Sequence, residues 1–165
     1  MAEENQTSGL PVFRRVERVE ALRVVLLGVA VGIIVPLLSA ALSKWVIDPI
    51  FCQDPNSFTV CANGGMIAYY ISTSLITIAA IALLVNWGIY RPLIIAVGAL
   101  VALWGLKKFI DPIAGANFVE YIALSAALFG VNYLLFFWFM QVRHFGVSIA
   151  LAVVAAVAIR WTLLV

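Results

Sequence analysis

Long, mostly apolar runs divide the chain, and polar or charged residues lie near their ends. Because about 20 mostly apolar residues cross the hydrocarbon core of a bilayer, each run is a candidate transmembrane helix. The runs cover residues 24–43, 66–87, 92–110, 118–140 and 145–165. The last run is the weakest candidate, since Arg160 interrupts it. The pattern predicts an all-α fold, a polytopic transmembrane helical bundle of about five helices.

A short motif occurs twice, each time at the end of an apolar run. The sequence KWVIDPI at residues 44–50 matches KKFIDPI at residues 107–113 at five of seven positions. A Tyr-Ile-x-x-Ser motif also follows each copy, at residues 70–74 and 121–125. Internal duplication is a recurring way of building membrane folds. The two matches predict two tandem helical hairpins, followed by one C-terminal helix.

These patterns divide the chain into a tail, two hairpins and a last helix. The tail ends in a segment in which apolar residues recur every three positions among arginines. This spacing is typical of an amphipathic helix, which either lies on the membrane surface or extends the first crossing into solvent. The four parts are residues 1–23, 24–90, 91–142 and 143–165.

Composition supports a membrane protein and excludes several other classes. Of 165 residues, 65% are apolar and 11% are charged, and the mean hydropathy is +1.11. Soluble domains have about 45–50% apolar and about 25% charged residues. The chain has no basic patch interleaved with aromatic residues, so we expect no nucleic-acid binding. It also has no motif of a known catalytic class and only one histidine, so we expect no enzyme, cofactor or metal site.

Charge and cysteine placement predict an orientation. Arginines flank the start of the first apolar run, and the positive-inside rule then places the N-terminus in the cytoplasm. The loop of the first hairpin and the C-terminus would lie outside the cytoplasm. Cys52 and Cys61 both fall in that loop, where disulfide bonds persist. We therefore expect a Cys52–Cys61 disulfide bond.

Four charged residues are candidates for a role at the outer face or within the membrane. Asp48 and Asp111 each precede a proline, so they suit the N-cap of a short interfacial helix, but they could instead form an acidic vestibule that attracts cations. Glu120 lies one turn inside the fourth run, where it would form an interfacial ion pair or handle protons or cations. The candidates are Asp48, Asp111, Glu120 and Arg160.

Polar and small side chains form patterns within the apolar runs. Polar residues on two helix faces either hydrogen-bond between helices or line a hydrated path: Tyr70, Ser74 and Thr77 on one, Tyr121, Ser125 and Asn132 on the other. Gly28 and Gly32 are four residues apart, which allows close helix packing within the chain or in a dimer.

Two functional hypotheses follow. The first is a non-catalytic integral membrane protein, a small helical subunit or scaffold that assembles with itself or with a larger membrane complex in the lipid bilayer. The alternative is a small oligomeric ion channel or solute transporter with an acidic outer vestibule. The sequence names no transported species and no partner.

Overall fold

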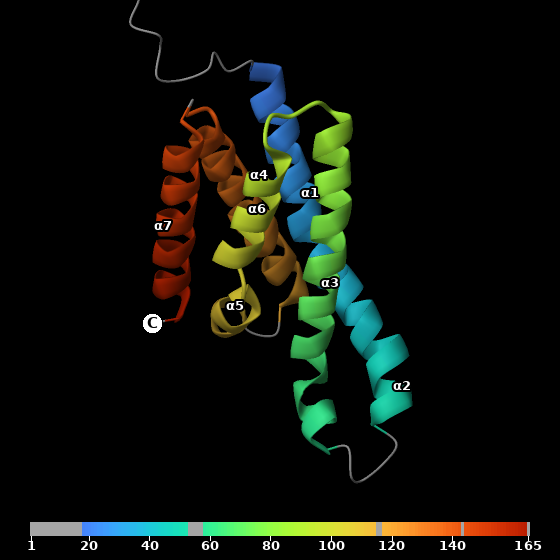
Figure 1. The fold of residues 1–165 in the computed structure, drawn as a ribbon. Helices are drawn as coiled ribbons and strands as arrows, with labels where there is room; N and C mark the ends of the chain where they lie inside the picture. The colour runs from blue at the N-terminus through green and yellow to red at the C-terminus, as the bar shows by residue number, and fades with distance from the viewer. Residues whose placement is uncertain (1–17, 53–57, 115–116, 143, 165) are drawn as a thin grey trace, which may run out of the picture.

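The computed structural model describes residues 18–52, 58–114, 117–142 and 144–164, and these residues are almost entirely helical. In chain order, the elements are α1 (Arg18–Leu42), the π-helical turn η1 (Ser43–Ile47), α2 (Asp48–Phe51), α3 (Phe58–Asn86), α4 (Pro92–Ala102), α5 (Leu106–Ala114), α6 (Phe118–Met140) and α7 (Phe145–Leu164). Figure 1 shows that the long helices run up and down along one common direction. The predicted all-α helical bundle is confirmed. Most of the predicted tail lies outside the described residues.

Four helices surround the core, and α7 packs on the outside. Helix α1 contacts α6 most extensively and also packs against α3, while α4 contacts α3, α6 and α7. The interior is filled mainly by aromatic and aliphatic side chains, of which Tyr69, Phe129, Tyr133, Phe136 and Phe137 are almost fully buried. The core therefore lies between α1, α3, α4 and α6.

The contact between α1 and α6 depends on glycine. A Cβ atom added at Gly32 would lie 2.5 Å from the Cα atom of Ala126 and 2.6 Å from the carbonyl oxygen of Ser125. One added at Gly28 would lie 2.9 Å from the carbonyl oxygen of Phe129. The two backbones approach this closely only because neither glycine has a side chain. The glycine pair predicted for helix packing therefore joins two helices of the same chain.

The third predicted crossing is not one continuous helix. Helix α4 has 11 residues and is about 16 Å long at 1.5 Å per residue, whereas a bilayer core is about 30 Å thick. Leu103, Trp104 and Gly105 form a turn after it, and Gly105 has a φ of +96°, a conformation that favours glycine. The prediction of a single helix over residues 92–110 is therefore wrong. The backbone leaves the right-handed helical conformation at Gly105.

Helix α5 follows this turn and has two different faces. Leu106 and Ile110 are fully buried, whereas Lys108 and Asp111 are exposed. An amphipathic helix of this kind lies along the boundary between apolar and polar surroundings. The second copy of the repeated motif lies in α5, and the first copy continues α1 through η1 and α2. Both copies are helical, and the internal duplication itself stays a prediction.

Four stretches of helix are long and apolar enough to cross a membrane. They are Arg18–Ile50, Asn63–Asn86, Phe118–Met140 and Phe145–Thr162. The first has 33 residues and the third has 23, so the first is about 15 Å longer at 1.5 Å per residue. The extra length lies at one end, where η1, α2 and the start of α3 stand beyond α5 and the end of α7 (Figure 1). We call η1, α2 and Phe58–Gly64 of α3 the projecting hairpin.

Candidate functional site

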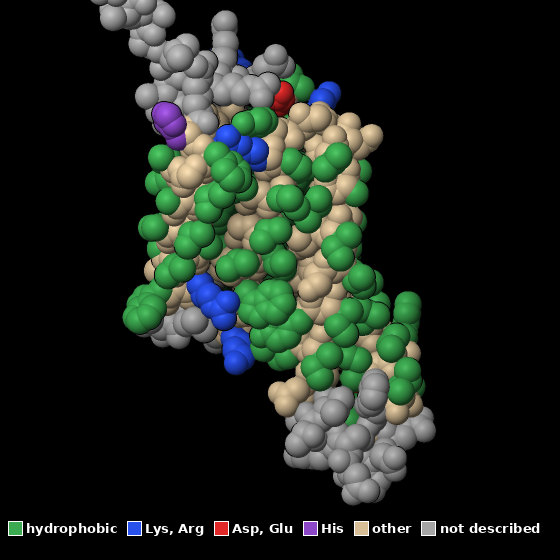
Figure 2. Space-filling view, viewed as in Figure 1, with side chains coloured by type: hydrophobic (Ala, Val, Ile, Leu, Met, Phe, Trp, Pro, Cys, Tyr) green, Lys and Arg blue, Asp and Glu red, His purple; other side chains and the backbone are tan. Residues whose placement is uncertain are grey.

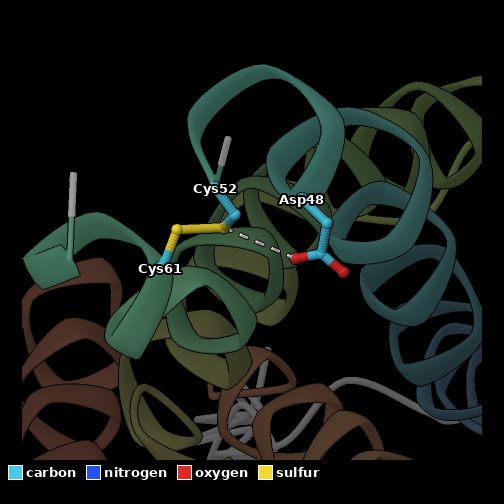
Figure 3. The surroundings of a disulfide bond; sticks show 3 residues. All are labelled: Asp48, Cys52 and Cys61. Atoms are coloured by element: carbon cyan, nitrogen blue, oxygen red, sulfur yellow. Dashed lines mark hydrogen bonds between the residues drawn. A yellow bond between two sulfur atoms is a disulfide. The ribbon is translucent and has the colours of Figure 1, made fainter. Parts of the chain in front are cut away.

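The projecting hairpin is closed by a disulfide bond. Cys52, directly after α2, is joined to Cys61 in the first turn of α3, and their Cα atoms are 5.4 Å apart (Figure 3). This is the bond that the sequence predicts. Below it, Ile47 of η1 lies against Gly64 of α3, where an added Cβ atom would be 3.1 Å from the isoleucine side chain. The two arms are thus held together by covalent and packing contacts.

The hairpin exposes large apolar side chains. Trp45 is 75% exposed and Ile50 is 64% exposed, and Val46 between them is also exposed. In Figure 2, hydrophobic side chains extend along the part of the hairpin that stands clear of the bundle. Trp45, Val46 and Ile50 lie at the end of the first candidate span, and exposed apolar surface there is typical of a surface that contacts lipid or another molecule.

A cleft of about 280 Å³ lies beside the base of the hairpin. It is bounded by the end of α1, by η1, by α3, by α5 and by the start of α6. Its lining residues are Pro36, Ser39, Ala40, Ser43, Gly65, Lys107, Asp111, Asn117, Phe118 and Tyr121. This volume is close to the lower limit of small-molecule sites, about 300 Å³. Its lining is more polar than that of two further hollows, one between α4 and α7 and one along α7.

An ion pair lies in the cleft. Lys107 Nζ is 3.2 Å from Asp111 Oδ2, one turn along α5, and their side chains are 28% and 50% exposed. The Lys107 ammonium also lies 5.6 Å from the ring centroid of Tyr121 on α6. At this exposure the pair contributes little to stability, about 0.5 kcal/mol. It fixes the position of one positive and one negative charge beside each other.

Glu120 takes part in the cap of α6. Its carboxylate accepts a hydrogen bond from the side-chain amide of Asn117 at 2.9 Å, and the side-chain Oδ1 of Asn117 accepts from the backbone N–H of Val119 at 3.2 Å. Glu120 is exposed in the first turn. Asn117 and Glu120, three positions apart before an apolar run, form a variant of the capping box. That spacing is a sequence signal that could have identified Asn117.

The N-cap expected at Asp48 and Asp111 is wrong. Asp48 has helical dihedral angles at the first position of α2, and no side chain caps that helix. Asp111 lies inside α5 and pairs with Lys107. Helix α1 continues through η1 into α2 without a break, so no free N–H groups remain for Asp48 to cap. The first copy of the repeated motif thus extends α1 through η1 and α2. The second copy forms part of the surface helix α5.

The four charged candidates have different surroundings, and the acidic vestibule stays an alternative hypothesis. Asp48 lies exposed on the projecting hairpin, where its Oδ1 is 3.9 Å from the sulfur of Cys52 (Figure 3). A disulfide sulfur has no proton to donate, so this is a contact and not a hydrogen bond. Asp111 lines the cleft, Glu120 caps α6, and Arg160 is exposed near the end of α7. The four charges therefore lie on four different helices in different surroundings.

The polar stripe on α3 is satisfied largely within its own helix. Ser74 donates to the carbonyl of Tyr70 at 2.9 Å, and Thr77 donates to the carbonyl of Thr73 at 2.7 Å. The ring of Tyr70 stacks on that of Trp104, with centroids 4.9 Å apart. The O–H donors of these hydroxyls are therefore satisfied within the helix and need no water.

The predicted polar residues on one face of α6 form fewer hydrogen bonds than those on α3. Ser125 is fully buried and its Oγ has no hydrogen-bond partner among the described residues. Asn132 donates to the carbonyl of Leu128 at 2.9 Å, but its own side-chain oxygen is buried without a described partner. The hydroxyl of Tyr69 on α3, which the sequence analysis did not select, has the same property. These three are the buried side-chain oxygens without a hydrogen-bond partner among the residues that the structure describes.

Arg91 organises the opposite end of the bundle. It precedes α4 with φ 51° and ψ 57°, the left-handed region, and its guanidinium donates to the carbonyl of Val142 at 3.4 Å. The guanidinium carbon also lies 4.5 Å from the ring centroid of Tyr90 and 4.9 Å from that of Phe145. Arg91 thus connects the turn before α4 to the turn before α7. Sequence analysis did not select Arg91 as a candidate.

Fold and site together define a multi-pass helical membrane protein with a projecting, disulfide-closed hairpin and an interfacial cleft. Comparison of the chain with protein-family models, with curated proteins and with solved structures finds no match. The functional argument therefore depends on the geometry of the molecule alone.

Proposed function

We propose that this chain is a non-catalytic subunit of a membrane assembly, formed with a larger membrane complex or with further copies of the chain. The observation that supports this most is the projecting hairpin with its exposed Trp45 and Ile50. Buried tryptophans at the centre of an interface are among the residues that contribute most to binding. A hairpin closed by a disulfide presents such a side chain with little loss of conformational entropy on binding. In this proposal the N-terminus is cytoplasmic and the hairpin lies outside.

Replacing Trp45 by alanine is expected to dissociate the assembly while the bundle stays folded. The complex would be extracted from its native membrane in a mild detergent, and its mass and composition would be measured. The matched control is Trp161→Ala, because Trp161 is similarly exposed, at 71%, near the end of α7. We expect Trp45→Ala to weaken association by about 2 kcal/mol, roughly thirtyfold, and Trp161→Ala to leave it intact.

Three results would separate the possibilities. A stoichiometric unrelated partner identifies an accessory subunit, and a closed ring of identical chains identifies a homo-oligomer. If both tryptophan variants behave like the wild type, Trp45 only anchors the chain in the interface, as tryptophans do at membrane surfaces. A monomeric wild-type chain in native membranes would contradict the proposal.

The alternative function is a small channel or solute transporter. The observation that favours it is the set of three buried oxygens without described partners, on Tyr69, Ser125 and Asn132. Unsatisfied polar atoms in a membrane interior are costly, and water in a path would satisfy them. Against it stand the hydroxyls of α3, which bond to their own helix. We expect vesicles that contain the purified protein to show ion flux equal to protein-free vesicles, and flux abolished by Asn132→Leu would favour the alternative.

A further inference from the structure

The cleft beside the projecting hairpin lies where apolar and polar parts of the chain meet. Ser43 follows the first apolar run, Gly65 precedes the second, and Asn117 precedes the fourth. When the long helices span a bilayer, these positions lie at the level of the lipid headgroups. A cleft at that level is open to the polar part of a phospholipid.

The walls of the cleft offer two opposite charges next to each other. Lys107 Nζ and Asp111 Oδ2 are 3.2 Å apart, and both side chains are partly exposed. The hydroxyls of Ser39 and Ser43 also line the cleft. The two formal charges sum to zero, so the cleft gives no general preference for an anion or a cation. It complements a ligand in which a negative and a positive group are close together.

Apolar side chains also line the cleft. The apolar lining residues include Pro36 and Ala40 of α1 and Phe118 of α6. A purely ionic ligand would gain nothing from these side chains, whereas a ligand with a polar head and an adjoining apolar part would contact both surfaces. The lining thus has the amphiphilic character of a phospholipid site.

Two unsatisfied polar groups lie one helical turn from residues that line the cleft. The hydroxyl of Tyr69 and Oγ of Ser125 are buried without described partners. Each is four residues, or one helical turn, deeper on the same helix face than a cleft residue, Gly65 in one case and Tyr121 in the other. Pro36 has no N–H, so it also leaves one backbone carbonyl of α1 without its usual donor. The polar groups of the cleft therefore continue one turn into the bundle.

We propose that this cleft binds the phosphoethanolamine headgroup of a membrane phospholipid, with the phosphate at Lys107 and the ammonium at Asp111. A phosphate accepts hydrogen bonds from an ammonium side chain, and a primary ammonium donates to a carboxylate. A phosphocholine headgroup has the same charges but no N–H to donate to Asp111. A phosphoglycerol headgroup has no positive charge. The site thus selects ethanolamine over both. This inference does not depend on the proposed subunit function.

The test is competitive lipid binding to the full-length chain. The protein is purified in detergent and stripped of lipid, then mixed with equal amounts of ethanolamine, choline and glycerol phospholipids that have identical acyl chains. Native mass spectrometry measures the occupancy of each. We expect the wild type to prefer the ethanolamine lipid about tenfold, the effect of one charge-assisted hydrogen bond.

Variants assign the preference to the cleft. Asp111→Asn should reduce the preference for ethanolamine over choline to near parity, and Lys107→Gln should lower the occupancy of both. The matched control is Lys108→Gln, because Lys108 is an exposed neighbour that does not line the cleft. Ala40→Phe fills the cleft without touching the ion pair, so it should abolish ethanolamine binding even if the α5 variants were to fold poorly. Helix content by circular dichroism monitors folding.

Two outcomes would overturn the proposal. One is equal occupancy by all three lipids in the wild type. The other is an unchanged preference in Asp111→Asn and Ala40→Phe. A further arm adds soluble phosphoethanolamine to the lipid-bound protein. Failure to displace the lipid supports a membrane phospholipid as the ligand, and displacement at equal concentration identifies the soluble ester instead.

Discussion

Replacing Gly32 by alanine will destabilise the bundle by about 3 kcal/mol. The added Cβ atom would lie 2.5 Å from Cα of Ala126 and 2.6 Å from the Ser125 carbonyl oxygen, both of which are backbone atoms of α6. Backbone atoms in the middle of a helix cannot rotate away as a side chain can, so α1 and α6 must separate. Overpacking in a closely packed interior typically costs about 1–3 kcal/mol, and the rigid partner here places the change at the upper end of that range.

Reversible unfolding in mixed micelles measures this change. The matched control is Gly146→Ala, because an added Cβ atom there meets nothing within 4 Å. Gly98→Ala should be intermediate, since its Cβ atom would meet the ring of Phe136, which can shift. Equal stability of the Gly32 and Gly146 variants would contradict the packing described between α1 and α6.

Removing the disulfide will loosen the projecting hairpin and leave the rest of the bundle intact. Cys52 and Cys61 are 9 residues apart, and closing a loop of that size stabilises the folded state by about 2–3 kcal/mol through the entropy of the unfolded chain. We expect the Cys52→Ser, Cys61→Ser double variant to exchange amide hydrogens faster in residues 58–64. The helices α6 and α7 should exchange as in the wild type.

Chemical labelling of the same cysteines tests the proposed orientation. A membrane-impermeant maleimide added to intact cells should label the wild type only after a reductant has opened the bond. The double variant has no other cysteine and is the unlabelled control. Labelling without reductant would contradict the disulfide. Labelling only after the cells are opened would place the hairpin in the cytoplasm.

Sequence reasoning located the long helices because their signal is local. Four of the five predicted apolar runs correspond to helices long enough to cross a membrane, with α6 over the same residues as predicted. The disulfide could also be predicted from the sequence, because two cysteines in one loop leave a single intramolecular pairing. In both cases neighbouring residues contain all the information that is needed.

The features that could not be predicted from the sequence depend on backbone conformation or on residues that are distant in the chain. Gly105 stands among apolar residues, and composition does not reveal that its φ is positive. Glu120 was expected to form an interfacial ion pair or to handle protons or cations, but its carboxylate accepts a hydrogen bond from Asn117 in a helix cap. The partner of Gly32 is separated from it by more than half of the chain, so the spacing of small residues could predict close packing but not the helix that provides it.

The contact between α1 and α6 has a consequence for biosynthesis. Helices enter a membrane in the order of translation, so α1, α3 and α4 are present before α6 has been made. Until then the glycine face of α1 has no partner within the chain, although the hairpin of α1 and α3 can already form. The last large contact of the core is therefore completed late, and a chain truncated before Phe118 would keep an unpaired glycine face in the membrane. Quality-control proteases that recognise unpaired transmembrane helices would have a physical basis for distinguishing the incomplete chain from the finished one.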